Sequence, residues 1–186
     1  MKKLILASKS PRRDEILTLV GLEHEISVSD ADETVPEGTG AADAAAINSA
    51  RKAAAVIATT SGERVVLAAD TVVEADGETF GKPKDAEDAA RMLRKMSGGH
   101  HFVHTGVTVT DGVRTVTETV STGVVMRKLT EREIEGYIGS GEPFDKAGAY
   151  GIQDAGALLV SGITGDYYNV MGLPVGRLAR ELKNMY

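Results

Sequence analysis

The chain of 186 residues contains no cysteine and no tryptophan, and aromatic residues make up only 4% of it. Without cysteine it can form neither a disulfide nor a thiolate metal site, and it has no cysteine nucleophile. Few aromatics and a net charge of −6 argue against a nucleic acid polymer as partner, because proteins that bind one usually present basic surfaces with stacking aromatics. Basic clusters on an acidic protein instead favour a small anionic ligand.

Long apolar runs are also missing. The first one, residues 4–7, is far shorter than a signal peptide or a membrane span requires. We therefore expect a cytoplasmic protein that contacts no membrane. The length predicts a single domain over residues 1–186, large enough to bury a core without cross-links.

Strand patterns and helix patterns alternate along the chain. Apolar or alternating segments predict strands at residues 3–8, 25–28, 65–69, 71–75, 103–110, 113–126 and 157–160. Capping residues, prolines and an alanine-rich stretch predict helices at 11–20, 41–58, 85–96, 130–138 and from 174 onward. Asp-Gly pairs at 76–77 and 111–112 predict two antiparallel hairpins. This mixture favours an α/β fold bordering on α+β, with a mixed, twisted sheet and flanking helices.

The first predicted strand leads directly into a helix start. Ser10 is the expected N-cap of that helix, and Ile16, Leu17 and Val20 are its expected buried stripe. Gly21 is the expected end of the helix.

Ser8, Arg12 and Arg13 surround this helix start. Backbone N–H groups at a helix N-terminus favour an anion, whereas two arginines in the first turn oppose the helix dipole. Their charges cost about 0.3–1 kcal/mol each unless an anion neutralises them. The segment therefore predicts a phosphate receptor. Ion pairs to Asp14, Glu15 or other surface acids are the alternative.

Asp70 follows five apolar residues, so we expect it at the sheet edge in partly buried surroundings. A carboxylate there needs a cation, a metal ion or several hydrogen bonds. Glu33 is a candidate for a second hard oxygen ligand, and two carboxylates with phosphate oxygens suit Mg²⁺ or Mn²⁺. A turn or cap role is the alternative for Asp70, and a solvated acidic loop is the alternative for Glu33.

Three lysines are candidates for binding a polyphosphate together, although each alone would be an ordinary surface charge: Lys52, Lys82 and Lys146. Lys82 is the strongest, because a glycine and a proline restrict the backbone on either side of it. Lys52 lies four residues after Asn48 in a predicted helix, so the two share a helix face.

Other site chemistries find little support. The histidines of HHFVH, residues 100–104, lack an obvious third metal ligand, and we expect them to be structural or solvent-facing. Ser10 lacks the Ser-His-Asp order of a hydrolase nucleophile. The chain contains no GxxxxGK[ST], which argues against a P-loop kinase.

Eight segments, in order over nearly the whole chain, resemble the motifs of the Maf family of nucleoside triphosphate pyrophosphatases. They are SKSPRR at 8–13, DET at 32–34, ARKA at 50–53, AADTVV at 68–73, GKPKD at 81–85, HFVHTGV at 101–107, FDKAGAYGIQ at 144–153 and YYNVMGLP at 167–174. The resemblance implies a mixed α/β fold with two lobes around a cleft, similar to the inosine triphosphatases. It also implies a metal-dependent hydrolase that cuts a nucleoside triphosphate between its α and β phosphates.

The resemblance also implies roles for single residues. The acidic catalytic residue of the family, described as the proton acceptor, corresponds to Asp70. The other charged residues of the family's pocket correspond to Arg13, Glu33, Lys52 and Lys82. The implied products are a nucleoside monophosphate and pyrophosphate, and the implied role is a house-cleaning one, the removal of non-standard nucleotides. Some members of the family are linked to arrest of cell division. A homodimer is a further expectation from the family.

In the subgroup acting on dTTP and UTP, three specificity positions carry arginine, threonine and glutamine. Here these positions are Arg12, Thr71 and Gln153. A glutamine amide offers one donor and one acceptor, which complement O4 and N3–H of thymine or uracil. The resemblance therefore implies pyrimidine triphosphates as substrates.

The combined hypothesis is that the cationic side chains hold the triphosphate while a divalent ion bridges its oxygens to the two carboxylates. Water then attacks the α-phosphorus, with Asp70 as base or as metal ligand. The alternative is a non-catalytic nucleotide-binding regulator of septum formation, which needs the cationic pocket but no metal ion.

Overall fold

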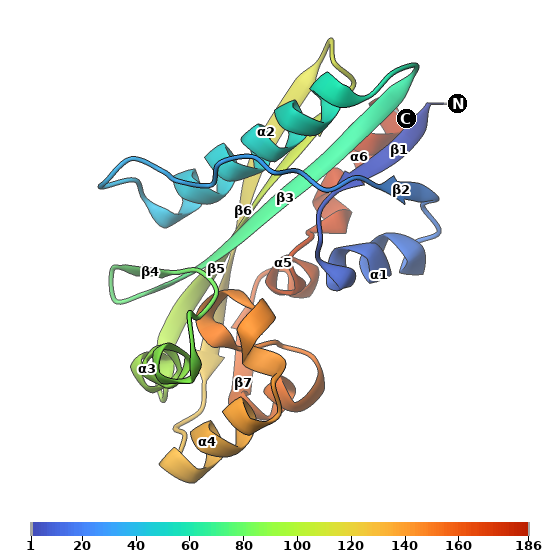
Figure 1. The fold of residues 1–186 in the computed structure, drawn as a ribbon. Coiled ribbons are helices and arrows are strands. Elements are labelled where there is room, and N and C mark those ends of the chain that lie inside the picture. The colour runs from blue at the N-terminus through green and yellow to red at the C-terminus, as the bar shows by residue number, and fades with distance from the viewer. Residues whose placement is uncertain (1, 186) are drawn as a thin grey trace.

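The computed structural model describes residues 2–185, which build a seven-stranded sheet with helices on both faces (Figure 1). The strands are β1 (Lys3–Ala7), β2 (His24–Ile26), β3 (Arg64–Ala75), β4 (Glu78–Phe80), β5 (His100–Thr110), β6 (Thr115–Met126) and β7 (Val160–Thr164). Their order is β2-β1-β3-β5-β6-β7, and β4 pairs with β3 beside this row. β1 runs parallel to β2 and β3, whereas the other pairs are antiparallel. The predicted fold class is confirmed.

The helices cover both faces of this sheet. They are α1 (Pro11–Leu19), α2 (Ala41–Thr59), α3 (Ala86–Met96), α4 (Glu131–Gly139), α5 (Tyr167–Met171) and α6 (Val175–Met185). Three short 3-10 helices, η1 (Glu142–Asp145), η2 (Ala147–Ala149) and η3 (Asp154–Leu159), lie between α4 and β7. Within residues 2–185, no helix is both long enough and apolar enough to span a membrane.

β3 is the central strand, and its alternating side chains join two separate parts of the core. Val66 and Ala68 pack against α2 on one face. Val65, Leu67 and Ala69 pack on the other face in the cluster that includes residues of α1 and α6. A strand buried on both faces reads as a continuous apolar run, which is why the sequence predicted it so clearly.

A third apolar cluster lies farther along β3, where α3 and α4 cover the sheet. It contains Val73 of β3, Val103 of β5 and Phe80 of β4 among its buried side chains. The long strands β3, β5 and β6 run through both regions, so one sheet carries two lobes (Figure 1). The boundary between the lobes falls near the middle of β3.

Helix ends mostly follow the local sequence signals. Asp85 accepts a hydrogen bond from the backbone N–H of Asp88 at 2.8 Å, and Thr130 and Glu133 form a reciprocal capping box. The prediction for Ser10 was wrong, because its side chain makes no capping bond to the helix. The hydroxyl that serves this turn belongs to Ser8, which accepts a hydrogen bond from the Ser10 backbone N–H at 3.1 Å.

Two further predictions were wrong. Val20 is 45% exposed, because α1 ends at Leu19 and the backbone turns before Val20 can reach the sheet. The segment 157–160 is not a buried strand: η3 continues to Leu159, and β7 begins at Val160 with no fully buried residue. An apolar run of four residues is too short to distinguish a strand from a tight helical turn.

Candidate active site

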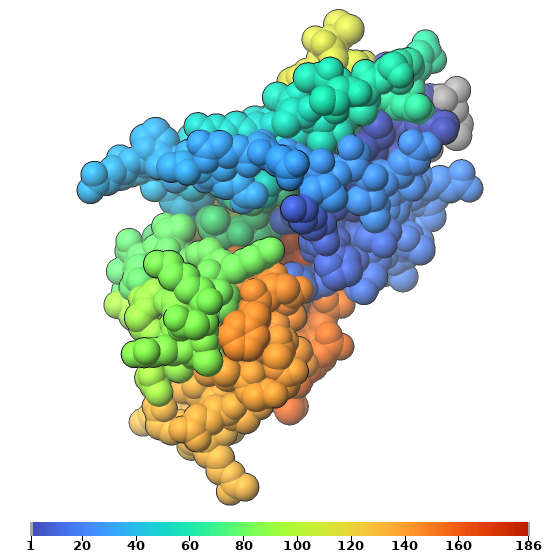
Figure 2. Space-filling model, viewed as in Figure 1, coloured from blue at the N-terminus to red at the C-terminus, as the bar shows by residue number. Residues whose placement is uncertain are grey.

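A cavity of about 610 Å³ lies between the N-terminal segment, β3, α2 and the 3-10 helices η1 and η2. Figure 2 shows the surface hollowed between the blue N-terminal segment and the green and orange segments below it. The residues predicted for the site all line this cavity: Ser8, Arg12, Arg13, Glu33, Lys52, Asp70, Thr71, Lys82 and Gln153. Residues separated by up to 145 positions in the sequence are therefore brought to one place.

The cavity exists because β3 is unpaired on one side near its middle. β1 pairs with β3 only as far as Ala7 opposite Ala68, and β4 pairs with it only from Val73 onward. Asp70 lies between these two pairings and is hydrogen-bonded as a strand residue only to β5, opposite Gly106. The prediction that Asp70 lies at the sheet edge was wrong, since β3 continues through it to Ala75 and Asp70 pairs with β5. The carboxylate lies instead at an interior gap of the sheet.

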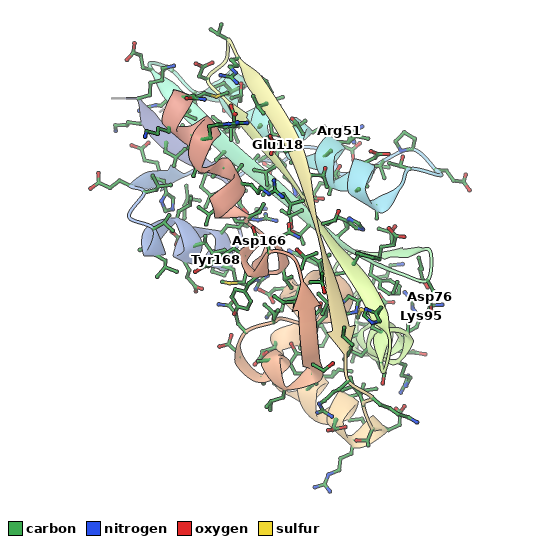
Figure 3. All side chains as sticks on the ribbon, turned by 180° about the vertical axis from the view of Figure 1, so that it is seen from behind. Arg51, Asp76, Lys95, Glu118, Asp166 and Tyr168 are labelled. Carbon is green, nitrogen blue, oxygen red and sulfur yellow. The ribbon has the colours of Figure 1, made fainter. Side chains whose placement is uncertain are left out.

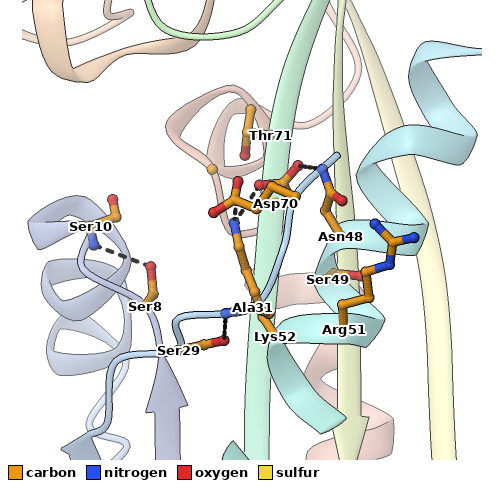
Figure 4. Close-up of polar contacts among 12 residues, drawn as sticks. Ser8, Ser10, Ser29, Ala31, Asn48, Ser49, Arg51, Lys52, Asp70 and Thr71 are labelled. Atoms are coloured by element: carbon orange, nitrogen blue, oxygen red, sulfur yellow. Dashed lines mark hydrogen bonds and ion pairs between the residues drawn. The ribbon is translucent and has the colours of Figure 1, made fainter. Parts of the chain in front are cut away.

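Lys52 connects the two carboxylates predicted for metal binding. Its Nζ lies 2.6 Å from Oδ1 of Asp70 and 3.1 Å from Oε2 of Glu33. The Lys52 and Asp70 side chains are 13% and 11% exposed, whereas the Glu33 side chain is 56% exposed. Figure 4 shows Lys52 extending from α2 toward Asp70. Two carboxylates are thus close enough to share one cation.

Asn48 contacts the other oxygen of Asp70. Its Nδ2 donates to Oδ2 at 3.3 Å, and Figure 4 shows it beside the carboxylate, on the side away from Ser8. Asn48 is buried, and its Oδ1 has no hydrogen-bond partner within residues 2–185. Turning the amide over would place Oδ1 against a carboxylate oxygen, which is repulsive, so the chemistry fixes its orientation.

Arg13 is almost fully buried at the start of α1. Its guanidinium donates to Gly172 O at 2.8 Å, to Ser8 Oγ at 2.9 Å and to Thr71 Oγ1 at 3.0 Å. Burial lowers its pKa to about 10, and the negative charge of Asp70 opposes that shift. Arg13 therefore stays charged at neutral pH and links α1, β3 and the end of α5.

Arg12 points the other way, toward η1. Its Nη1 donates to Asp145 Oδ2 at 2.7 Å and its Nη2 to the Asp145 carbonyl at 3.2 Å. Lys146 contacts the same carboxylate, with Nζ 2.9 Å from Oδ1. The ion pair proposed as the alternative for the arginines exists for Arg12, although its partner is Asp145 of the other lobe and not a neighbour in α1.

Lys82 and Gln153 complete the lining with side chains that make no hydrogen bond or ion pair inside the described residues 2–185. Lys82 lies between β4 and α3, and Gln153 stands immediately before η3. Both belong to the lobe that faces α1 across the cavity. Their polar ends are therefore available to a ligand.

The histidines of residues 100–104 lie on β5. His101 is buried, bonds to the Tyr150 hydroxyl at 2.6 Å and meets that ring edge-on. Burial lowers the pKa of His101 to about 4, so it is neutral at pH 7. Because Tyr150 lines the cavity, this pair supports the cavity wall.

A divalent ion suits the acidic side of the cavity. The ammonium of Lys52 occupies a position from which one cation contacts both carboxylates. No group of three or more histidine, aspartate or glutamate side chains within residues 2–185 is placed to hold a metal ion. Two protein carboxylates with further oxygens from water and phosphate are a usual donor set for Mg²⁺. The residues present therefore fit such an ion together with a phosphate ligand.

Sequence reasoning missed Asn48 and Asp145 as parts of the site. For Asn48 the signal was available, since its spacing from Lys52 places both on one face of α2. Asp145 offered no local signal, because its contact with Arg12 joins residues 133 positions apart. Only the arrangement of the two lobes brings that pair together.

Comparisons with known proteins show which family and which proteins this chain resembles. The family described as Maf-like protein matches residues 3–185. A dTTP/UTP pyrophosphatase of Bacillus cytotoxicus is 50% identical over 183 residues, which cover 98% of this chain and 95% of that protein. One of Bacillus cereus is 46% identical with the same coverage. A HAM1 protein from Coxiella burnetii, 11% identical, superposes with a TM-score of 0.50 over 99% of this chain and 100% of that one, a likeness of fold alone.

Proposed function

Because the chain belongs to the Maf-like protein family, we propose that it hydrolyses nucleoside triphosphates to the monophosphate and pyrophosphate, with dTTP and UTP as substrates. The observation that carries this proposal is the single cavity in which a cationic wall faces the carboxylates of Asp70 and Glu33. A triphosphate needs the cations, and cleavage between its phosphates needs the carboxylates. The same cavity offers both.

Arg12, Lys52 and Lys82 would hold the phosphate oxygens, with Ser8 as a further hydrogen-bond partner. Arg13 would act mainly through its charge and through the fixed position of Thr71, because its N–H groups already have protein partners. These cations would meet the negative charge that grows on the leaving pyrophosphate. These contacts bind the substrate and stabilise the departing group.

Asp70 and Glu33 would hold a divalent ion, Mg²⁺ or Mn²⁺. Such an ion neutralises phosphate oxygens and lowers the pKa of a water molecule bound to it. Asp70 is the better placed acid to accept the proton of the attacking water, since it is buried and held by β3 and Asn48, whereas Glu33 lies on an exposed loop.

Thr71 and Gln153 approach the cavity from β3 and from the opposite lobe. The Gln153 amide would read O4 and N3–H of thymine or uracil, because it can donate to one and accept from the other. A cytosine edge reverses the donor and acceptor, although a rotated amide would still match it. A purine brings a larger ring system to the same amide, so we expect it to be hydrolysed more slowly.

The proposal is tested by pyrophosphate release in the presence of Mg²⁺ with dTTP, UTP, CTP, dATP and dGTP. The expected result is pyrophosphate from dTTP and UTP at rates well above those for purines. Equal turnover of purines would contradict the role of Gln153. Binding of dTTP without any pyrophosphate would favour the alternative, a nucleotide-binding regulator of septum formation. A house-cleaning role toward modified pyrimidine triphosphates belongs to the same proposal, as do a cytoplasmic location and a homodimer.

A further inference from the structure

We propose that Lys52 is an exchangeable cation of the site. It neutralises Asp70 and Glu33 until a divalent ion takes these carboxylates, and it then binds the triphosphate, so that metal ion and nucleotide bind cooperatively. This inference rests on the proposed function, because it needs both a divalent ion and a polyphosphate in the same cavity. It adds a second role to a residue so far considered only as a phosphate ligand.

The geometry of the ion pairs is the first step. The ammonium lies between the carboxylates, 2.6 Å from Asp70 Oδ1 and 3.1 Å from Glu33 Oε2. A divalent ion shared by these two residues needs oxygens from both, and the ammonium contacts one oxygen of each. Because two cations at the same oxygens repel each other, the ammonium and the divalent ion compete.

The second step is that the Asp70 carboxylate and the backbone of Glu33 are held in place. Asp70 belongs to β3, is paired with β5 and receives the Asn48 amide on its other oxygen. Glu33 lies on a loop, but Arg51 donates to the carbonyls on both sides of it, at 3.2 Å to Asp32 and 2.5 Å to Thr34. The Asp70 carboxylate and the backbone that carries Glu33 can therefore stay in place when the cation between the two acids changes.

The third step is that the lysine is the movable partner. The Lys52 ammonium is carried by a flexible chain of four methylene groups from α2. Aspartate carries its carboxylate on one methylene group, so Asp70 on a central strand has much less freedom to move. Lys52 lines the cavity of about 610 Å³ that Arg12 and Lys82 also line. A short rotation away from the carboxylates leaves the ammonium in the cavity where the phosphates of a nucleotide would bind.

Charge then couples the two ligands. Two carboxylates and one ammonium carry a net charge of about −1, so one negative charge remains to attract a further cation. When a divalent ion binds without nucleotide, it displaces the Lys52 ammonium into the cavity that Arg12, Arg13 and Lys82 also line. No anion is then present to neutralise these positive charges. A triphosphate supplies that anion, so each ligand should strengthen the binding of the other by the same factor.

The test measures binding of Mn²⁺ alone, without nucleotide, by electron paramagnetic resonance of the free ion. Lys52→Met removes the competing ammonium and keeps much of the side-chain volume. We expect it to bind Mn²⁺ about tenfold more tightly than the unchanged protein, the size expected when a partly buried competitor is removed. Lys82→Met is the matched control, since Lys82 lines the cavity without touching either carboxylate, and its affinity for Mn²⁺ should stay within about twofold.

A second measurement follows the coupling itself. A dTTP analogue with a methylene group between the α and β phosphorus atoms should tighten Mn²⁺ binding to the unchanged protein more than to Lys52→Met. Lys52→Arg keeps the positive charge and should retain weak Mn²⁺ binding without nucleotide. If Lys52→Met is less stable, its unfolding temperature should still rise more with Mn²⁺ than that of the unchanged protein.

Unchanged or weaker Mn²⁺ binding by Lys52→Met would overturn the exchange. That outcome is separable from a failure of the proposed function. Pyrophosphate release by the unchanged protein, with no gain of Mn²⁺ affinity in the variant, removes only the exchange. Tighter Mn²⁺ binding in the variant, with no pyrophosphate from any nucleotide, keeps the exchange of cations and removes the hydrolysis.

Discussion

Asp70 has a different partner on each carboxylate oxygen, Lys52 on Oδ1 and Asn48 on Oδ2. It is 8% exposed, so an uncompensated charge at this place would be costly. The two partners compensate the buried carboxylate and orient it toward the cavity. An aspartate in a central strand is unusual, and this arrangement explains how the fold accommodates it.

Asp70→Asn should lower pyrophosphate release by at least about 100-fold while nucleotide binding stays measurable. The amide keeps the shape of the side chain but has no negative charge with which to accept a proton or hold a divalent ion. Two measurements are needed: kcat with dTTP, and a binding titration with the dTTP analogue that carries a methylene group between its α and β phosphorus atoms. Full turnover by this variant would remove Asp70 from the catalytic role.

Asn48 has a buried carbonyl oxygen without a partner in the part of the chain that the structure describes. An orphaned buried polar group costs about 1–3 kcal/mol, and the single bond to Asp70 is long. Asn48→Leu should therefore leave the free energy of unfolding unchanged or raise it. Turnover should fall several-fold, because Asp70 loses the contact that orients Oδ2.

Ser49→Ala is the control for that variant. Ser49 is the next residue on α2, is fully buried and shares a hydrogen bond with Thr108 at 2.9 Å, but it does not contact Asp70. It should lose about 1 kcal/mol of stability with normal turnover. The reverse pattern, a large loss of stability in Asn48→Leu with full activity, would show that Asn48 serves only the core. Urea unfolding and kcat separate the two cases.

α2 carries much of the site, since Asn48, Arg51 and Lys52 all project from it. Its close approach to the sheet is possible because β5 has a glycine beneath it. A Cβ on Gly106 would lie 2.2 Å from the Ala45 carbonyl oxygen, a backbone atom of α2 that cannot turn aside. The helix can approach β5 this closely only over a residue without a side chain.

Gly106→Ala should therefore destabilise the fold by about 1–3 kcal/mol and displace α2 from the sheet. Activity should fall as well, because Asn48 and Lys52 of the displaced α2 would no longer be within hydrogen-bond distance of Asp70. The measurement combines thermal unfolding with pyrophosphate release. Gly136→Ala in α4 is the matched control, since nothing lies within 4 Å of the added carbon and alanine favours a helix. Equal behaviour of the two variants would contradict the packing argument.

The two lobes contact each other across the cavity through Arg12 and Asp145. Arg12 in α1 bonds to Asp145 in η1, and Figure 3 shows from behind how the long strands carry both ends of the molecule. The Asp145 side chain is 50% exposed, so this ion pair adds little to stability. The continuous strands therefore set the distance between the lobes, and the ion pair mainly positions Arg12.

Stability of the whole molecule should depend on pH through His101. Its pKa is about 4 in the folded protein and about 6.5 when unfolded. Between these values the unfolded chain binds a proton that the folded protein does not, so the free energy of unfolding falls as the pH drops from about 6.5 to about 4. His101→Gln keeps a partner for the Tyr150 hydroxyl and should reduce this slope.

The measurement is urea unfolding at several pH values from 7 to 4. His100→Gln is the control, because His100 is exposed on the same strand and supplies only the smaller of the two causes that lower the His101 pKa, so it should change the slope less than His101→Gln does. Other groups, such as Asp111, whose pKa is lowered by Lys2, contribute at more acidic pH and are the same in both variants. An identical slope in His101→Gln and the unchanged protein would show that burial of His101 has no role in acid stability.

The strands and helices were largely predictable because their signals are local. The apolar run of β3, the alanines of α2 and the capping box at Thr130 each depend on residues a few positions apart. The predictions for Ser10 and Val20 were wrong because both residues flank the ends of α1. At a helix end, a small shift of the boundary decides whether a side chain caps the helix or packs against the sheet. Such ends depend on the packing around them and not on propensity.

The sequence by itself determined the types of side chain in the site, since acids, arginines and lysines at these positions carry the chemistry whatever their surroundings. It also determined the strands and helices that hold them, through local periodicity. Only the tertiary structure decided which cation faces which acid. It placed Asp70 at an interior gap of the sheet, Lys52 between two carboxylates and Arg12 on the opposite lobe. These pairings join residues 18 to 133 positions apart, so they depend on how β3, α2 and η1 pack together and leave no local trace.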